Sequence, residues 1–281
     1  MLNRLTMLAC VLPAVLLAAL SPARMTARTT AQGTTTPSNA GDSARVILQR
    51  YADAWKGRQE LAFDGALVLA FWVRGGQGGT YNLTLSHTPG TTIREGSPAQ
   101  YDIGFEVDIE FLRRLDRGEM GALTAMGQAR STDPIPLNPK LGELFSARPD
   151  ASLLFRRVAF HFWNRDWPEI VPFGEGATRQ VHGGNAAVLV YDQEFRSAWY
   201  QLKPGMHINA DPGDQSNDFP QLIVVTRGRV NARLDGRQLV VSEGQAIFIP
   251  AGMAHEFWAA AGLRLLPLIL TPGSRPAVTG R

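Results

Sequence analysis

The sequence predicts an α+β region followed by an all-β region. In the first part of the chain, apolar residues recur both at helical spacing and at alternating spacing, whereas from Gln180 to Leu270 only alternating spacing is found. The chain has 281 residues, of which 44% are hydrophobic and 19% charged, so it is long enough for two globular domains. We therefore expect two folded domains joined by a helical connection.

The N-terminal segment has the order of a secretory signal peptide. Arg4 precedes an almost unbroken apolar run, Leu5–Leu20, and small residues such as Ala23 follow it. The run is shorter than the about 20 residues of a membrane-spanning helix. We interpret residues 1–27 as a cleaved signal and expect a periplasmic or secreted protein with no stable membrane span. An uncleaved anchor is the alternative.

Composition narrows the possible chemistry. Cys10 is the only cysteine and lies in the signal, so the mature chain has no disulfide and no thiol ligand. The formal net charge is +3, and no cluster of Lys and Arg with interleaved aromatic residues is found. We therefore expect no nucleic-acid partner.

The first domain is predicted to span residues 43–139, after a flexible Thr- and Ser-rich linker at 28–42. Its elements are expected in the order helix, strands, two short helices. The first helix has one apolar face, and the strands alternate and are joined by Gly and Pro turns, which favours antiparallel pairing. The residues that carry these patterns are Ala44, Ile47, Leu48, Tyr51 and Trp55 for the helix, and Leu67, Leu69, Phe71, Val73, Tyr81, Leu83, Leu85, Tyr101, Ile103, Phe105 and Val107 for the strands.

After these strands, helical spacing returns from Ile109 to Met126, and prolines at 134–139 end the unit. A further helical stretch, Ala151 to Trp163, lies in the predicted connection at 140–176.

The segment YDIGFEVDIEFLRRLDRGEMGALTAMGQAR, residues 101–130, resembles the sterol carrier protein family. The shared pattern is a strand, Asp108 at the start of a helix, Gly118-Glu119 before a second short helix, and a return after Gly127. The resemblance implies a sheet covered by helices over an apolar tunnel for acyl chains or sterols. It therefore implies a small apolar molecule or lipid as partner.

Apolar side chains of this domain are candidate tunnel residues. Three of them, Phe105, Leu115 and Met126, are predicted to bind the ligand, and Phe71, Leu83, Phe111, Met120 and Leu123 are further candidates. Methionine side chains adapt to ligands of variable shape. The alternative is that the same residues form a solid core, as apolar stripes commonly do.

The second domain is predicted to span residues 177–274, with a short tail at 275–281. Its short alternating strands are typical of a small β-barrel. Asp235-Gly236 separates two of them and predicts a tight hairpin.

The string GQAIFIPAGMAHEF, residues 244–257, resembles the second motif of the cupin superfamily, from Gly244 through Pro250 and Gly252 to His255. The resemblance implies a double-stranded β-helix barrel. Because cupin barrels pair through their edge strands, it also implies a homodimer.

The first cupin motif carries changed residues. Counting back from its glycine, Gly228, the glutamate position holds Gln221, and the two histidine positions fall at Gln215 and Asn217. Amides are weak, neutral ligands for the Fe, Mn, Ni, Cu or Zn that the family binds. We therefore expect no cofactor, with a divalent metal at His255, joined by His207, as the weaker alternative.

The polar side chains at the positions of the two cupin motifs predict a ligand site at the mouth of the barrel. His255, Gln221, Asn217 and Gln215 would bond a small molecule, and Phe248 and Phe257 would form apolar walls together with Trp199 and Trp258. The alternative is a core histidine bonded to Gln221.

These patterns together predict an exported, non-catalytic protein that binds an apolar or lipid-like small molecule. Its metal-poor cupin barrel would serve as a module for binding or for dimerisation. The competing hypothesis is a metal-dependent cupin enzyme of the dioxygenase or isomerase type acting on a small substrate. A third is a structural protein in which neither cavity is open.

Overall fold

The computed structural model describes residues 41–55, 65–86, 91–128, 134–165, 170–191, 195–259 and 263–270. The predicted signal, most of the predicted linker and the predicted tail lie outside the described residues. Among the described helices, none has both the length and the apolar character needed to cross a membrane.

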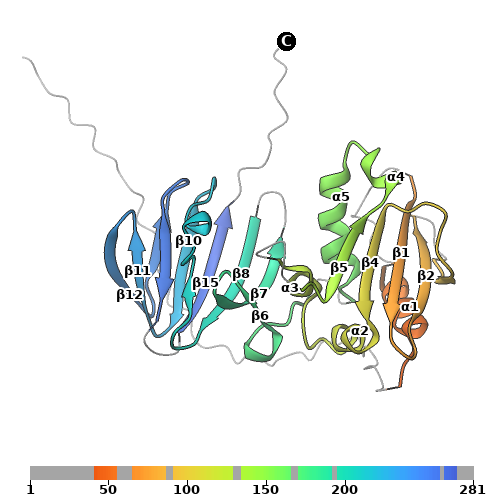
Figure 1. Cartoon of the computed structure of the whole chain (residues 1–281), viewed down its shortest axis with the longest axis horizontal. Helices are drawn as coiled ribbons and strands as arrows, with labels where there is room; N and C mark the ends of the chain where they lie inside the picture. Colours follow the sequence, from red (N-terminus) through yellow and green to blue (C-terminus); the bar gives the residue numbers. More distant parts are fainter. Residues whose placement is uncertain are drawn as a thin grey trace, which may run out of the picture. The chain divides into compact units, whose positions relative to one another are not determined.

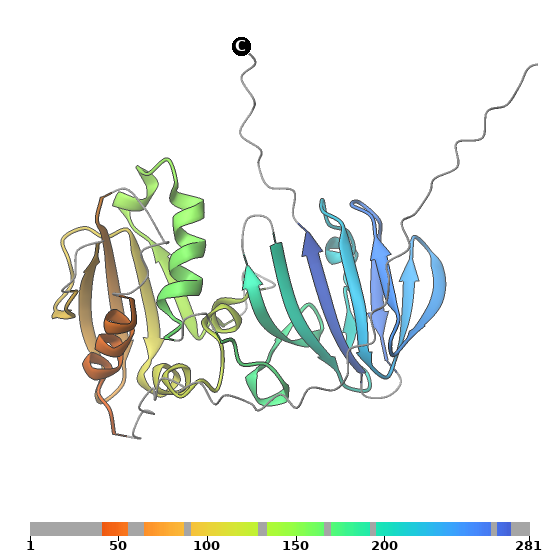
Figure 2. The same cartoon turned by 180° about the vertical axis from the view of Figure 1, so that it is seen from behind.

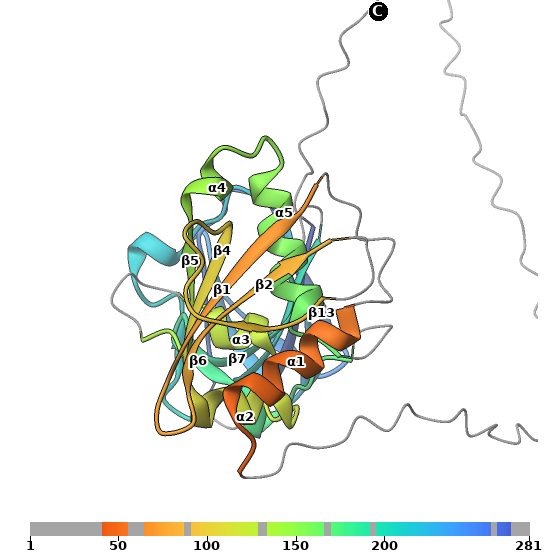
Figure 3. The ribbon, with the colours of Figure 1, turned by 90° about the vertical axis from the view of Figure 1, so that its right-hand side faces the viewer.

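The first region is a five-stranded sheet with helices. In chain order the elements are α1 (Ala44–Trp55), β1 (Leu67–Arg74), β2 (Gly79–Leu85), β3 (Arg94–Glu95), β4 (Ile103–Asp108), α2 (Ile109–Asp116), α3 (Ala122–Met126) and β5 (Leu137–Leu141). The strand order is β3-β2-β1-β4-β5. Figure 3 looks onto this sheet and shows α1 and the later helix α5 running across it.

The pairing of β1 with β4 corrects the predicted all-antiparallel sheet. These two strands are parallel, with Phe71 opposite Phe105, whereas the other pairs are antiparallel. The chain passes β3 before it returns, so β4 runs beside β1 in the same direction. Glycine and proline turns predict hairpins between strands that are neighbours in the sequence. They do not predict beside which strand the chain returns after a longer connection.

The predicted apolar faces of the first region are confirmed. Every predicted apolar residue of α1 is buried, and in β1 the alternating residues Leu67, Leu69, Phe71 and Val73 are buried. Helix periodicity and strand alternation therefore placed these side chains correctly.

Aromatic rings fill the space between this sheet and its helices. The ring centroids of Phe71 and Phe105 are 5.9 Å apart, those of Phe105 and Trp163 5.2 Å, and those of Tyr51 and Trp163 5.1 Å. Such offset and edge-to-face pairs add to the stabilisation from burial. The centre of the region is therefore a packed core.

The predicted connection holds α4 (Glu143–Ser146), α5 (Ala151–Arg157), the π-helical turn η1 (Val158–Phe162) and the 3-10 turn η2 (Glu175–Ala177). The predicted helix 151–163 therefore changes to π-helical geometry after Arg157. Phe162 and Trp163, at its end, belong to the core of the first region. A π-helical turn widens the helix locally and redirects the side chains after it.

The second region contains strands only, apart from the 3-10 turn η3 (Pro212–Asp214). The strands are β6 (Arg179–Val181), β7 (Gly184–Tyr191), β8 (Phe195–Leu202), β9 (His207–Ile208), β10 (Gln221–Arg227), β11 (Arg229–Leu234), β12 (Arg237–Ser242), β13 (Ala246–Ile249), β14 (His255–Trp258) and β15 (Leu263–Leu270). Figure 1 shows β10, β15, β8 and β7 side by side, and Figure 2 shows the same strands from behind.

These strands form two sheets, with orders β13-β10-β15-β8-β7-β6 and β12-β11-β14-β9. Buried residues from both sheets share one core, including Ile223, Val225, Val230 and Phe257. The predicted single barrel is thus a pair of sheets around a core, and no closed barrel is found among the described strands.

The predicted hairpin at Asp235-Gly236 is confirmed. It joins β11 to β12, and the φ angles are 47° for Asp235 and 79° for Gly236. Two successive positive φ angles are those of a type I′ turn, which matches the twist of the flanking strands.

Candidate functional site

The alternation of β14 sends its side chains to opposite faces of the smaller sheet. His255 and Phe257 point into the core and are 3% and 1% exposed. Glu256 and Trp258 therefore face the other way. The turn Pro250–Ala254 that precedes the strand holds His255 at the beginning of the inward-facing row.

The imidazole of His255 is oriented by three contacts. Its Nδ1 lies 2.9 Å from the carbonyl oxygen of Met253, and its Nε2 lies 3.3 Å from Nε2 of Gln221 and 3.4 Å from Nδ2 of Asn217. A carbonyl oxygen only accepts, so Nδ1 carries the proton and Nε2 is the acceptor. The two amides donate to Nε2 and keep their carbonyl oxygens for other partners.

Backbone hydrogen bonds hold the two motifs together. The His255 amide donates to the carbonyl of Gln215 at 2.8 Å, and the Gly252 amide donates to that of Asn217 at 2.7 Å. The four residues predicted for the polar site are therefore brought together, with Gln215 contributing its backbone to the contact. Counting back from Gly228 thus selected residues that lie close to His255.

The site favours a neutral imidazole. Burial lowers the pKa of His255 below its ordinary value, and the hydrogen bond to Met253 opposes this only in part. At neutral pH the site therefore offers one nitrogen acceptor, two amide groups and no net charge from these three side chains.

The donor set does not fit the metal that cupins commonly hold. Among the described residues, no group of three or more His, Cys, Asp or Glu side chains could hold a metal ion. His255 is accompanied by amides, which bind divalent ions weakly.

His207 is not brought to His255. It lies opposite Trp258 in the β9–β14 pair, and its Nε2 is 2.7 Å from a carboxylate oxygen of Glu256. The other carboxylate oxygen is 2.6 Å from Arg233. The two imidazoles therefore lie on opposite faces of one sheet, and the predicted second metal ligand lies against the carboxylate of Glu256 instead.

The two phenylalanines predicted as walls of the ligand site, Phe248 and Phe257, also lie on different faces of their sheets. The ring centroid of Phe257 is 5.9 Å from that of His255. Phe248 is 62% exposed and lies opposite Leu222, whereas the inward neighbours Gln221 and Ile249 are paired one step along the strands. Phe248 is therefore directed away from the polar site.

The candidate tunnel residues of the first region lie in or near its core. Phe105 is fully buried, and Met126 packs partly buried against the same core. Leu115 lines a cavity of about 70 Å³ together with Tyr51, Trp163 and other residues. Ligand pockets usually measure about 300 to 1,000 Å³, so this cavity is several times too small for an acyl chain or a sterol.

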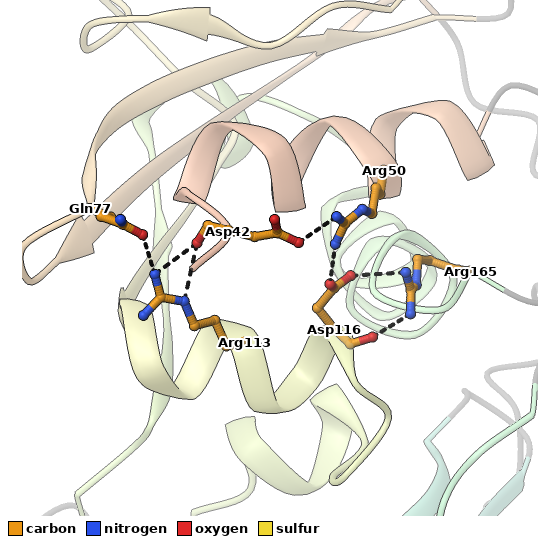
Figure 4. A network of polar contacts seen from close by, with 6 residues as sticks. All are labelled: Asp42, Arg50, Gln77, Arg113, Asp116 and Arg165. Atoms are coloured by element: carbon orange, nitrogen blue, oxygen red, sulfur yellow. Dashed lines mark hydrogen bonds and ion pairs between the residues drawn. The ribbon is translucent and has the colours of Figure 1, made fainter. Parts of the chain in front are cut away.

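A buried network of charges lies beside this cavity (Figure 4). The carboxylate of Asp116, which is fully buried, is 2.6 Å from Arg50 and 2.9 Å from Arg165. Arg50 also contacts Asp42 at 2.5 Å, and Arg113 donates to the carbonyl oxygen of Asp42. The single carboxylate of Asp116 is shared by Arg50 and Arg165, so this network joins elements of the fold.

Arg196 is an inward-facing residue that the sequence analysis did not select. It lies opposite Ile269, which lies opposite Gln221, so Arg196 and Gln221 face the same side of the larger sheet. The sequence signal was present, because Arg196 alternates in phase with Ala198 and Tyr200. Arginine in a strand was not taken as an inward-facing residue.

Comparison with known proteins finds a family model that matches part of the second region. Residues 205–275 match the family model described as AraC-like ligand binding domain. No curated protein matches the chain.

Solved structures similar to the chain include a Cupin 2 conserved barrel domain protein from Salinispora arenicola, with 16% identity over 36% of this chain and 87% of that one, and a TM-score of 0.32. An RmlC-like cupin from Shewanella frigidimarina has 19% identity over 37% and 91%, with a TM-score of 0.31. A conserved protein of unknown function from Streptococcus pyogenes has 22% identity over 34% and 80%, with a TM-score of 0.30.

Residues 205–275 of the β-rich second region are therefore similar to an AraC-like ligand binding domain, and this region follows a region of helices and sheet. The match to a ligand-binding domain fits a role in binding a small molecule.

Proposed function

We propose that this chain is an exported, non-catalytic protein that binds a small polar molecule between the two cupin motifs. The observation that carries the proposal is the arrangement at His255. Its proton is held on Nδ1 by Met253, and its Nε2 faces the amides of Gln221 and Asn217. An oriented acceptor beside two amides can bond a ligand through both donors and acceptors.

Two further features support this proposal. The second region is similar to an AraC-like ligand binding domain, and the N-terminal sequence has the order of a signal peptide. The first region is less suited to hold an apolar or lipid-like ligand, because its aromatic rings are packed against one another and its described cavity is small. The proposal therefore places the ligand in the second region.

Calorimetric titration with sugars, amino acids and small organic acids tests binding. We expect one class to bind, and His255→Ala to weaken that binding about tenfold, because the acceptor is lost and two amides lose their partner. His207→Ala is the matched control, since His207 lies on the opposite face, and it should bind as the unmodified protein does. Equal binding by all three proteins would count against the proposed site.

Elemental analysis of the same preparations separates binding from metal-dependent catalysis. We expect no stoichiometric Fe, Mn or Zn, because the donors of the site are weak ligands. A stoichiometric metal that disappears in His255→Ala would overturn the non-catalytic proposal. The intact mass of protein recovered outside the cytoplasm tests export, which requires loss of the N-terminal segment.

A further inference from the structure

We propose that the ligand carries a carboxylate and that Arg196 binds it. This inference rests on the proposed function, because it names the chemical class of molecule bound beside His255.

The first step is the position of Arg196. Two strand spacings, about 10 Å, separate Arg196 on β8 from Gln221 on β10. The Cζ of Arg196 lies 5.3 Å from the ring centre of Phe219, which is two residues from both Asn217 and Gln221. The guanidinium therefore lies beside Phe219, in the segment that joins Asn217 to Gln221.

The second step is that Nε of the Arg196 guanidinium lacks a hydrogen-bond partner in the described part of the chain. This nitrogen is buried. The described neighbours of the guanidinium are aromatic, since the Cζ also lies 4.3 Å from the ring centre of Tyr191. Cation–π contacts favour the charge but do not satisfy the N–H groups. A buried donor of a charged group left without an acceptor is costly, so an acceptor from outside the chain would stabilise it.

The third step is the charge around the site. Glu256 follows His255 directly but faces the other side of the sheet, where it pairs with His207 and Arg233. Asp218 is exposed, and its neighbours Asn217 and Phe219 are partly buried. The described inward-facing side chains thus offer a cation, amide N–H groups and a neutral imidazole. That set complements a carboxylate, which arginine recognises through paired N–H groups.

The chemistry also limits the rest of the ligand. The amide carbonyls of Asn217 and Gln221 and Nε2 of His255 can accept hydrogen bonds from hydroxyl or amino groups. The rings of Tyr191 and Phe219 can contact an apolar or ring-shaped body. We infer a small hydroxylated or amino-substituted carboxylic acid.

The test is titration with matched pairs, in which each hydroxy or amino acid is compared with its primary amide, and inorganic phosphate serves as a second anion. We expect a carboxylate to bind at least about tenfold more tightly than its amide. Arg196→Gln should weaken carboxylate binding about 10- to 100-fold and leave binding of the amide nearly unchanged. The control Arg229→Gln, an exposed arginine on β11, should change neither.

A second measurement does not depend on the stability of the Gln variant. The Nε–H signal of Arg196 in a proton–nitrogen spectrum, assigned by its loss in Arg196→Lys, should shift on addition of the carboxylate and stay in place with the amide. The Lys variant keeps the charge and loses the paired N–H groups, so it should bind with intermediate affinity.

The outcomes distinguish the two proposals. Equal affinity for acid and amide, or unchanged carboxylate binding by Arg196→Gln, overturns the role of Arg196 and leaves the His255 site standing. Tighter binding of phosphate than of any carboxylate shows a different anion and also overturns the inference. Absence of binding by every probe contradicts the proposed function and, with it, this inference.

Discussion

The chemistry of His255 is decided by which ring nitrogen holds the proton. Met253 accepts from Nδ1, so Nε2 is left as an acceptor facing two amides. Protonation of Nε2 would set an N–H against amide N–H groups, and burial also disfavours the charge. A neutral imidazole is therefore part of the folded arrangement.

This arrangement predicts a pH dependence of stability. The pKa of His255 is lowered in the folded state, so below about pH 6.5 the unfolded chain takes up a proton before the folded one does. The free energy of unfolding should fall as pH drops through this range, by at most about 1.4 kcal/mol for each unit by which folding lowers the pKa. Above that range this contribution is fully present.

Urea denaturation of the protein and of His255→Gln at about pH 7.5 and 5.5 checks the prediction. The variant should lose less stability on acidification, because glutamine does not titrate. An identical pH dependence in both proteins would show that His255 is protonated equally in the folded and unfolded states.

Sequence reasoning predicted that His255, Asn217 and Gln221 lie together, and they do, because the spacing of a motif can be counted along the chain. It did not place His207 and Phe248, because their direction depends on strand register, and a slip of one residue reverses the face. Such shifts are present here, for example between Val188 and Val190. The reason that Arg196 was not selected is different, because a charged residue in a strand is expected to face solvent.

At the scale of elements, the charge network around Asp116 joins three segments. Asp116 ends α2, Arg50 lies on α1, and Arg165 follows the π-helical turn η1 (Figure 4). The carboxylate is fully buried, so each arginine gains a partner with little screening by solvent. The network therefore fixes the positions of these helices relative to one another.

Removal of this carboxylate should destabilise the fold strongly. Asp116→Ala leaves two arginines without their shared anion, and we expect a loss of about 3 to 5 kcal/mol in the free energy of unfolding. The matched control is Glu95→Ala, which removes an exposed ion pair with Arg45 and should cost at most about 1 kcal/mol. Similar midpoints for the two variants in urea would contradict the structural role of the network.

Local periodicity predicted most helices and strands, because burial of one face imposes its spacing on the sequence. The parallel pairing of β1 with β4 and the change to π-helical geometry at Val158 were not predictable in this way. Both depend on contacts between segments far apart in the chain. The resemblance to the sterol carrier family likewise concerns the order of elements and does not determine the size of a cavity.

At the scale of the whole molecule, the two regions differ in what they offer a ligand. The first region has a packed aromatic core and a described cavity of about 70 Å³. The second has oriented polar groups, and Nε of Arg196 finds no hydrogen-bond partner among the residues that the structure describes. We therefore expect a polar ligand to bind in the second region.

This difference predicts that the protein carries no acyl chain. A fatty acid needs a pocket of about 300 Å³ or more, and an increase of that size in the first region would separate the rings of Tyr51, Phe105 and Trp163. Protein purified without detergent should yield no stoichiometric lipid by extraction and mass spectrometry, and a fluorescent fatty acid should not bind saturably. A stoichiometric lipid, displaced by substitution of Leu115 with a larger residue such as Trp, would show that the first region opens to hold cargo, because Leu115 lines the cavity.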